Sequence, residues 1–87
     1  MQVILALLQN GRQFTTVIDI PNEIGLSPGI FLLIGSPSTG NLRVPISEID
    51  ISTSEDKMNI LRVDEAYPEI DELLNNPNLE WFSAEHT

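Results

Sequence analysis

The sequence contains no cysteine, only four basic residues and no long hydrophobic run. Without cysteine the chain can form neither disulfides nor thiolate metal sites, which argues against a small secreted scaffold held by disulfides. Residues 3–8 form an apolar run near the N-terminus with no basic residue before it. That run is too short for a signal-peptide core and far below the ~20 residues of a membrane span. These absences predict a cytoplasmic protein that does not enter the membrane.

The negative charge is concentrated in the second half of the chain. Of the 13 carboxylates that give the net charge of −9, only Asp19 and Glu23 precede residue 44, and Lys57 and Arg62 are the only cations after it. Such a surface repels phosphate and attracts basic partners over a Debye length of ~8–10 Å at physiological salt. The sequence therefore predicts a basic protein partner and no direct binding of nucleic acid.

A β-hairpin is the clearest local element. Asn10 and Gly11 form the preferred two-residue type I′ turn, flanked by apolar segments of strand length at residues 2–9 and 12–20. Pairing Gln9 with Arg12 fixes the register of every other pair. Residues 3–8 are apolar on both faces, which predicts a strand covered on both sides by a helix, another sheet or a second subunit.

Further strands and one helix are expected after the hairpin. Residues 30–34 form an apolar strand. Residues 42–51 change their apolar phase near Ser47, which predicts a bulge or a break, and therefore either one bent strand or two short strands. Residues 58–63 fit a short helix or a strand equally well. Pro68 suits the first position of a helix that ends before Pro77.

The predicted fold class is mainly β with a C-terminal helix (α+β). We expect a small antiparallel sheet or barrel that is built on the N-terminal hairpin and is dimeric, because a chain of 87 residues buries too little surface to be strongly stable alone. Residues 1–52 form the β-rich body. Residues 53–87 form an acidic segment with a short helix and an aromatic tail, within one domain overall.

No motif in the sequence supports catalysis, a cofactor or a metal. The loop from Gly35 to Gly40 has the outer spacing of a phosphate-binding loop but is followed by Asn41 instead of lysine. A calcium-like segment at residues 50–56 lacks the required glycine and the distant glutamate. The adjacent carboxylates at residues 64–65 and 71–72 do not face a common site, and His86 lies next to the chain end. We therefore predict that the protein is not an enzyme and has no catalytic, cofactor or metal site.

The acidic aromatic tail is the best candidate for a binding surface. Carboxylates can steer this segment onto a basic partner, while apolar and aromatic side chains anchor it in a groove. The alternative is that the helix packs on the sheet and that Trp81 and Phe82 close the core. The candidate partner-binding residues are Glu69, Asp71, Glu72, Leu73, Leu74, Leu79, Trp81 and Phe82.

The order of segments resembles the swapped-hairpin antitoxins of the AbrB and MazE kind. The matching features are Ile20 followed by Pro21, the glycine step at residues 26–29, the strand at 30–34 and the turn into a strand at 40–44. In that family an acidic C-terminal tail with aromatic anchors wraps a toxin, which is similar to residues 69–82. The first strand here lacks the basic residues with which the family contacts DNA. The resemblance thus implies a dimeric β-rich body with a partner-binding tail.

Two functions remain open on the sequence. The first is a non-catalytic acidic protein-binding module, which is either antitoxin-like or an inhibitor of a basic partner that handles nucleic acid. The second is a small structural or accessory subunit of a larger assembly, in which the apolar hairpin is the interface and the acidic half only improves solubility.

Overall fold

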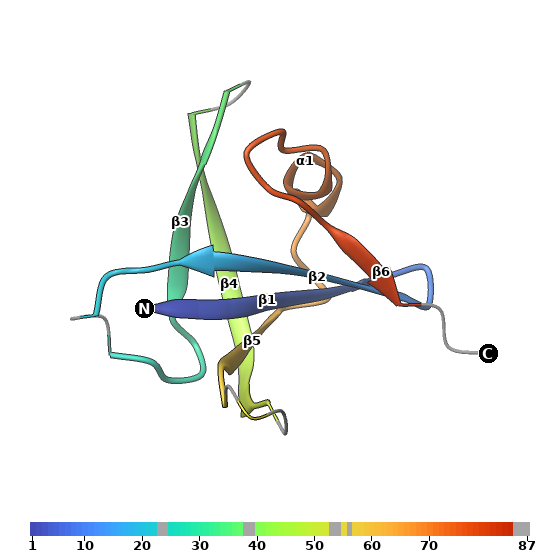
Figure 1. The fold of residues 1–87 in the computed structure, drawn as a ribbon. Helices are drawn as coiled ribbons and strands as arrows, with labels where there is room; N and C mark the ends of the chain where they lie inside the picture. Colours follow the sequence, from blue (N-terminus) through green and yellow to red (C-terminus); the bar gives the residue numbers. More distant parts are fainter. Residues whose placement is uncertain (23–24, 38–39, 53–54, 56, 85–87) are drawn as a thin grey trace.

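The computed structural model of the chain describes residues 1–22, 25–37, 40–52, 55 and 57–84. Six strands and one helix form within these residues (Figure 1). In chain order they are β1 (Gln2–Gln9), β2 (Arg12–Asp19), β3 (Phe31–Ser36), β4 (Gly40–Ile51), β5 (Asn59–Val63), α1 (Ile70–Leu74) and β6 (Phe82–Ala84). None of the helical segments in this described part has the length and apolar character needed to cross a membrane.

The predicted hairpin is confirmed in its turn and in its register. Asn10 and Gly11 both have positive φ, 54° and 75°, as a type I′ turn requires. β1 and β2 pair antiparallel from Gln9 with Arg12 to Gln2 with Asp19. The two faces of β1 are not equally covered. Side chains on one face, such as Leu5, are fully buried, whereas Leu8 on the other face remains exposed.

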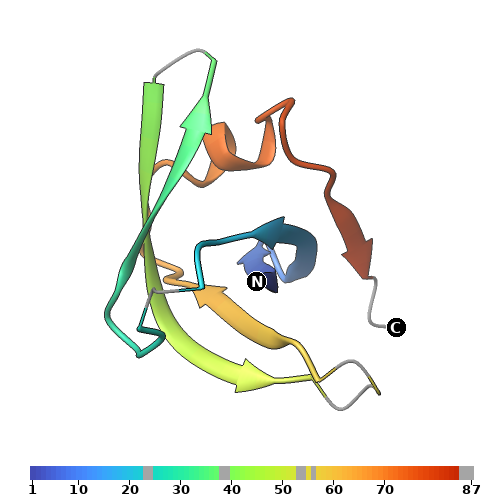
Figure 2. The same cartoon turned by 60° about the vertical axis from the view of Figure 1, so that its left-hand side comes forward.

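The six strands form one mixed sheet with the order β3-β4-β5-β1-β2-β6. The prediction of an antiparallel sheet is wrong at one pairing, because β5 runs parallel to β1, with Leu5 beside Leu61. The two strands are far apart in sequence, so no connecting turn between them allows their pairing to be predicted. β3 and β4 cross β1 and β2 at a steep angle in Figure 1, and Figure 2 shows the sheet curling around its interior.

The bulge predicted near Ser47 is present. The β4–β5 pairing shifts between Ile46 and Glu48, so β4 is one bent strand that changes the face on which its apolar side chains lie. The segment at residues 58–63, which fitted helix or strand, contains β5.

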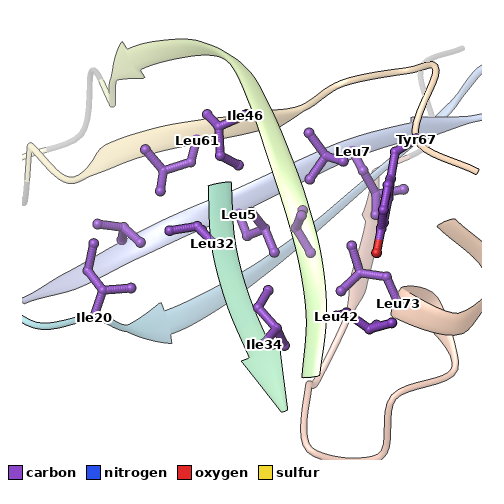
Figure 3. Close-up of a cluster of buried hydrophobic side chains, with 13 residues drawn as sticks. Leu5, Leu7, Ile20, Leu32, Ile34, Leu42, Ile46, Leu61, Tyr67 and Leu73 are labelled. Atoms are coloured by element: carbon purple, nitrogen blue, oxygen red, sulfur yellow. The ribbon is translucent and has the colours of Figure 1, made fainter. Parts of the chain in front are cut away.

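The core lies inside the curled sheet (Figure 3). It is formed by alternate side chains of β1 and β3–β5, by Ile20 after β2, and by two residues that follow β5, Tyr67 and Leu73. In Figure 3 Ile20 lies at one end of this cluster and Tyr67 and Leu73 at the other. Its buried members are Val3, Leu5, Leu7, Ile20, Leu32, Ile34, Leu42, Val44, Ile46, Leu61, Val63, Tyr67 and Leu73.

The helix is shorter and starts later than predicted. α1 begins at Ile70, two residues after Pro68, and the strand β6 follows it, so the chain returns to the sheet after its helix. The sheet also takes strands from both predicted segments, since β5 and β6 belong to residues 53–87 and β5 lies between β4 and β1. The sequence predictions for His86 and for the residues at 53, 54 and 56 lie outside the described residues.

Hydrogen bonds fix the stretch between α1 and β6 to the rest of the molecule. Asn76 is 3% exposed, and its Nδ2 donates to the carbonyl of Gly35 in β3 at 2.7 Å. Its Oδ1 accepts the backbone N–H of Asn78 at 3.0 Å. On the other side, Thr16 Oγ1 donates to the carbonyl of Glu80 at 2.7 Å. Because β2 and β3 both hold this stretch, it is a structural part of the fold.

Candidate protein-binding surface

A groove with acidic walls lies where β5 ends beside β1. It has a volume of about 380 Å³. Its apolar part comes from β1, and its walls come from the β4 bulge and the residues after β5. We call it the acidic groove, and its lining residues are Ala6, Leu7, Leu8, Gln13, Ser47, Glu48, Arg62, Val63, Asp64 and Glu65.

The charge of the acidic groove is strongly negative. Glu48, Asp64 and Glu65 contribute three carboxylates against the single cation of Arg62. That cation is already engaged, because Arg62 Nε donates to Asp50 Oδ2 at 2.8 Å, and Glu48 lies opposite Arg62 in the β4–β5 pairing. The groove therefore offers acceptors to an incoming lysine or arginine, while its apolar part can contact an aliphatic stem.

Backbone geometry positions the carboxylates after β5. The N–H of Asp64 donates to the carbonyl of Pro45 at 3.0 Å, and this bond keeps the start of the turn attached to β4. Asp64 Oδ1 then accepts the N–H of Ala66 at 2.9 Å, which closes a turn of the Asx type. The turn places Glu65 at its exposed tip.

More carboxylates follow on the same stretch of chain. Asp71 accepts a hydrogen bond from Gln9 Nε2, beside the end of β1, and Glu69 Oε2 accepts one from the Tyr67 hydroxyl at 3.3 Å. Burial of the Tyr67 ring raises its pKa to about 12, and the charge of Glu69, its hydrogen bond and the charge of Glu72 act in the same direction. The contributions of Glu69 and Glu72, which add to that of burial, indicate a locally negative potential around the start of α1.

The structure separates the predicted partner-binding residues into three groups by their exposure to solvent. Glu69, Asp71, Glu72 and Phe82 are exposed, and Phe82 keeps 59% of its surface accessible. Leu74, Leu79 and Trp81 are partly buried and pack against the core cluster. Leu73 is fully buried within it, so this side chain cannot reach a partner in the folded chain.

Trp81 belongs to the group that packs on the core. Its ring lies against the core cluster while staying partly accessible, and its Nε1 donates to the carbonyl of Leu73 at 3.1 Å. That carbonyl lies in the last turn of α1 and also accepts the backbone N–H of Asn76 at 3.3 Å. The indole therefore joins the end of α1 to the strand that follows.

Sequence reasoning missed the acidic groove. Asp64 and Glu65 were recognised only as adjacent carboxylates on a solvent face, and Glu48 was not singled out. The β4 bulge carries Glu48, and the parallel pairing of β5 with β1 brings the other two beside Leu8. The sequence predicts the bulge in β4 but gives no indication of the parallel pairing of β5 with β1.

Among the described residues no group of three or more histidine, cysteine, aspartate or glutamate side chains could hold a metal ion. Comparisons with family models, with curated proteins and with solved structures find no match for this chain. The geometry of its own residues therefore carries the functional argument.

Proposed function

We propose that the chain is a non-catalytic protein-binding module that recognises a basic protein through the acidic groove and the carboxylates at the start of α1. The observation that carries the proposal is the arrangement of Glu48, Asp64 and Glu65 around the apolar side chains of β1, with the one nearby cation engaged by Asp50. A partner that presents lysine or arginine on an apolar surface complements this arrangement.

The partner class follows from the electrostatics. Proteins that handle nucleic acid carry basic surfaces for phosphate, and an acidic module with net charge −9 can cover such a surface. An antitoxin-like neutraliser or another inhibitor of a nucleic-acid-handling protein is therefore the form of the proposal that we favour.

A charge-neutralising variant tests the proposal. The partner is first isolated at low salt on the immobilised chain, and its Kd is then measured by calorimetry for the wild type and for the triple variant Glu48→Gln, Asp64→Asn, Glu65→Gln. The amide oxygen introduced by Asp64→Asn can still accept the turn hydrogen bond, so the fold is preserved. We expect binding to weaken at least ~10-fold, which corresponds to ~1.4 kcal/mol.

A matched control removes the same number of charges elsewhere. The variant Asp19→Asn, Glu55→Gln, Glu80→Gln also changes the net charge by three but leaves the acidic groove intact. It should weaken binding less than about threefold, through long-range steering alone. Equal losses in the two variants, or no loss in the first, would exclude the acidic groove as the binding site.

A second candidate function is a structural or accessory subunit of a larger assembly. The observation that favours it is the exposure of apolar side chains on β1 and β2, where Leu8 is 44% and Val17 is 52% exposed. Under this alternative, assembly resists neutralisation of the acidic groove and is lost in Val17→Lys.

A further inference from the structure

β3 is a strand edge with little of the usual protection against pairing. Natural proteins guard exposed edges with charged residues, prolines, bulges or a covering loop, or keep the edge strand very short. Here the stretch after α1 reaches this edge only through the hydrogen bonds of Asn76 and Asn78 to the Gly35 carbonyl, and Phe31 and Leu33 remain exposed. The strand at the other end of the sheet, β6, has three residues. β3 has six, carries no charge and no proline, and pairs with β4 without a register shift. Among the described residues its other side has no strand beside it.

The direction of the backbone groups on this edge can be derived from one contact. The carbonyl of Gly35 accepts a hydrogen bond from Asn76, which lies outside the sheet, so this carbonyl points to the edge. In an antiparallel pair alternate residues direct their N–H and C=O groups to the same side. The backbone groups of Phe31 and Leu33 therefore also face the open edge. Pro45, opposite Phe31, has no N–H to donate, as this pattern requires.

The side chains of these two edge residues are large, apolar and exposed. Phe31 is 53% and Leu33 is 71% exposed. The guanidinium of Arg43 lies 4.5 Å from the centre of the Phe31 ring. An apolar groove of about 530 Å³ runs beside β3, and residues 18–21, Asn78 and Leu79 line its other parts.

The charge distribution favours a second copy of the chain as the occupant of this edge. Two chains of net charge −9 repel each other, and this repulsion opposes association least where carboxylates are absent. Residues 30–46 contain a single charged side chain, Arg43, and no carboxylate. Asp19, the one carboxylate that lines the neighbouring groove, is paired with the N-terminal ammonium at 3.0 Å.

We propose that β3 pairs antiparallel with β3 of a second copy to form a two-fold symmetric dimer. Phe31 of one copy then lies opposite Leu33 of the other, and each of these residues exchanges edge-facing N–H and C=O groups with its counterpart. This register leaves the hydrogen bond between Asn76 and Gly35 intact and gathers four exposed apolar side chains on one face. This self-association uses a surface other than the acidic groove and goes beyond the proposed function.

Sedimentation equilibrium of the full chain tests the dimer. We expect a mass of twice 9.7 kDa at concentrations up to about 1 mM, with a dissociation constant that falls as salt is raised, because salt screens the repulsion between the two acidic chains. A wild-type chain that stays monomeric, or that forms species larger than a dimer, overturns the proposal. The first result would leave the edge to an extended segment of another protein.

Two substitutions at Leu33 locate the interface. Leu33→Lys places a charge on the exposed face, and Leu33→Pro removes the N–H that faces the open edge while leaving the bonds to β4 in place. Each should weaken the dimer at least about tenfold. If Leu33→Pro fails to fold, as judged by near-ultraviolet circular dichroism of Trp81, Leu33→Lys decides alone.

The matched control is Val17→Lys, which changes a similarly exposed apolar residue on β2. It should leave the dissociation constant of the dimer unchanged within about twofold. A dimer that resists both Leu33 variants, or that Val17→Lys weakens as much, overturns the assignment to β3. Binding of the basic partner is measured separately and weakens with salt, so failure of one proposal is distinguishable from failure of the other.

Discussion

Replacing Trp81 with alanine should destabilise the whole domain, although this residue lies near the chain end. Its ring packs on the core while remaining partly accessible, so the loss is below the ~3–5 kcal/mol of a fully buried tryptophan. The lost indole hydrogen bond to Leu73 adds ~1 kcal/mol. Together these effects predict that the free energy of unfolding falls by about 2–4 kcal/mol, a large part of the ~5–15 kcal/mol of a typical domain.

Urea and thermal unfolding followed by circular dichroism measure this loss. For a domain of this size the melting temperature should fall by roughly 10–20 °C. Trp81→Phe keeps most of the apolar contact and should lose about 1–1.5 kcal/mol. Phe82→Ala is the matched control, because this neighbouring side chain is exposed and should cost no more than about 0.5 kcal/mol. A Trp81→Ala protein within about 0.5 kcal/mol of the wild type would refute the structural role of this ring.

Three further predictions concern one buried amide, one tyrosine and nucleic acid. Asn76→Asp replaces the donor to the Gly35 carbonyl with a carboxylate oxygen, so the free energy of unfolding should fall by at least ~2 kcal/mol at neutral pH and by less in acid, where the carboxyl can donate. Asn78→Asp should cost less, because Asn78 is exposed and its bond to the same carbonyl is long, at 3.5 Å. Tyr67, the only tyrosine, should ionise in the folded protein near its raised pKa of about 12, as followed by the ultraviolet absorbance of tyrosinate. The unfolded chain loses this proton at a lower pH, near a pKa of ~10, so the contribution of Tyr67 to stability is complete below that pH and is lost as the pH rises to about 12. A titration midpoint of ~10 in the folded protein would contradict the burial of the ring. In a mobility-shift assay at low salt the chain should bind no duplex DNA or RNA, and micromolar binding would contradict the electrostatic argument.

The sequence by itself determined the elements whose causes are local. The positive φ values that Asn10 and Gly11 tolerate define a two-residue turn, and a two-residue turn fixes every pair of the hairpin. The change of apolar phase near Ser47 likewise located the bulge in β4, because a bulge moves the following side chains to the opposite face.

The helix was placed less well. Its apolar stripe was visible, but its start depended on Pro68, and the chain there turns through Tyr67 before α1 begins at Ile70. The acidic and aromatic residues of the tail fit a core-facing or a partner-facing role equally. The hydrogen bonds of Asn76 and Trp81, which the sequence does not show, attach these two side chains to the fold.

The tertiary structure alone decided the pairing of β5 with β1, and with it both proposed surfaces. This contact joins segments more than fifty residues apart and is parallel, so no connecting turn encodes it. It places Asp64 and Glu65 beside Leu8 to form the acidic groove, and it sets the strand order that leaves β3 at an edge. The charge of the chain was visible in its sequence, whereas the position of that charge relative to an apolar groove and an open edge depends on which distant strands become neighbours.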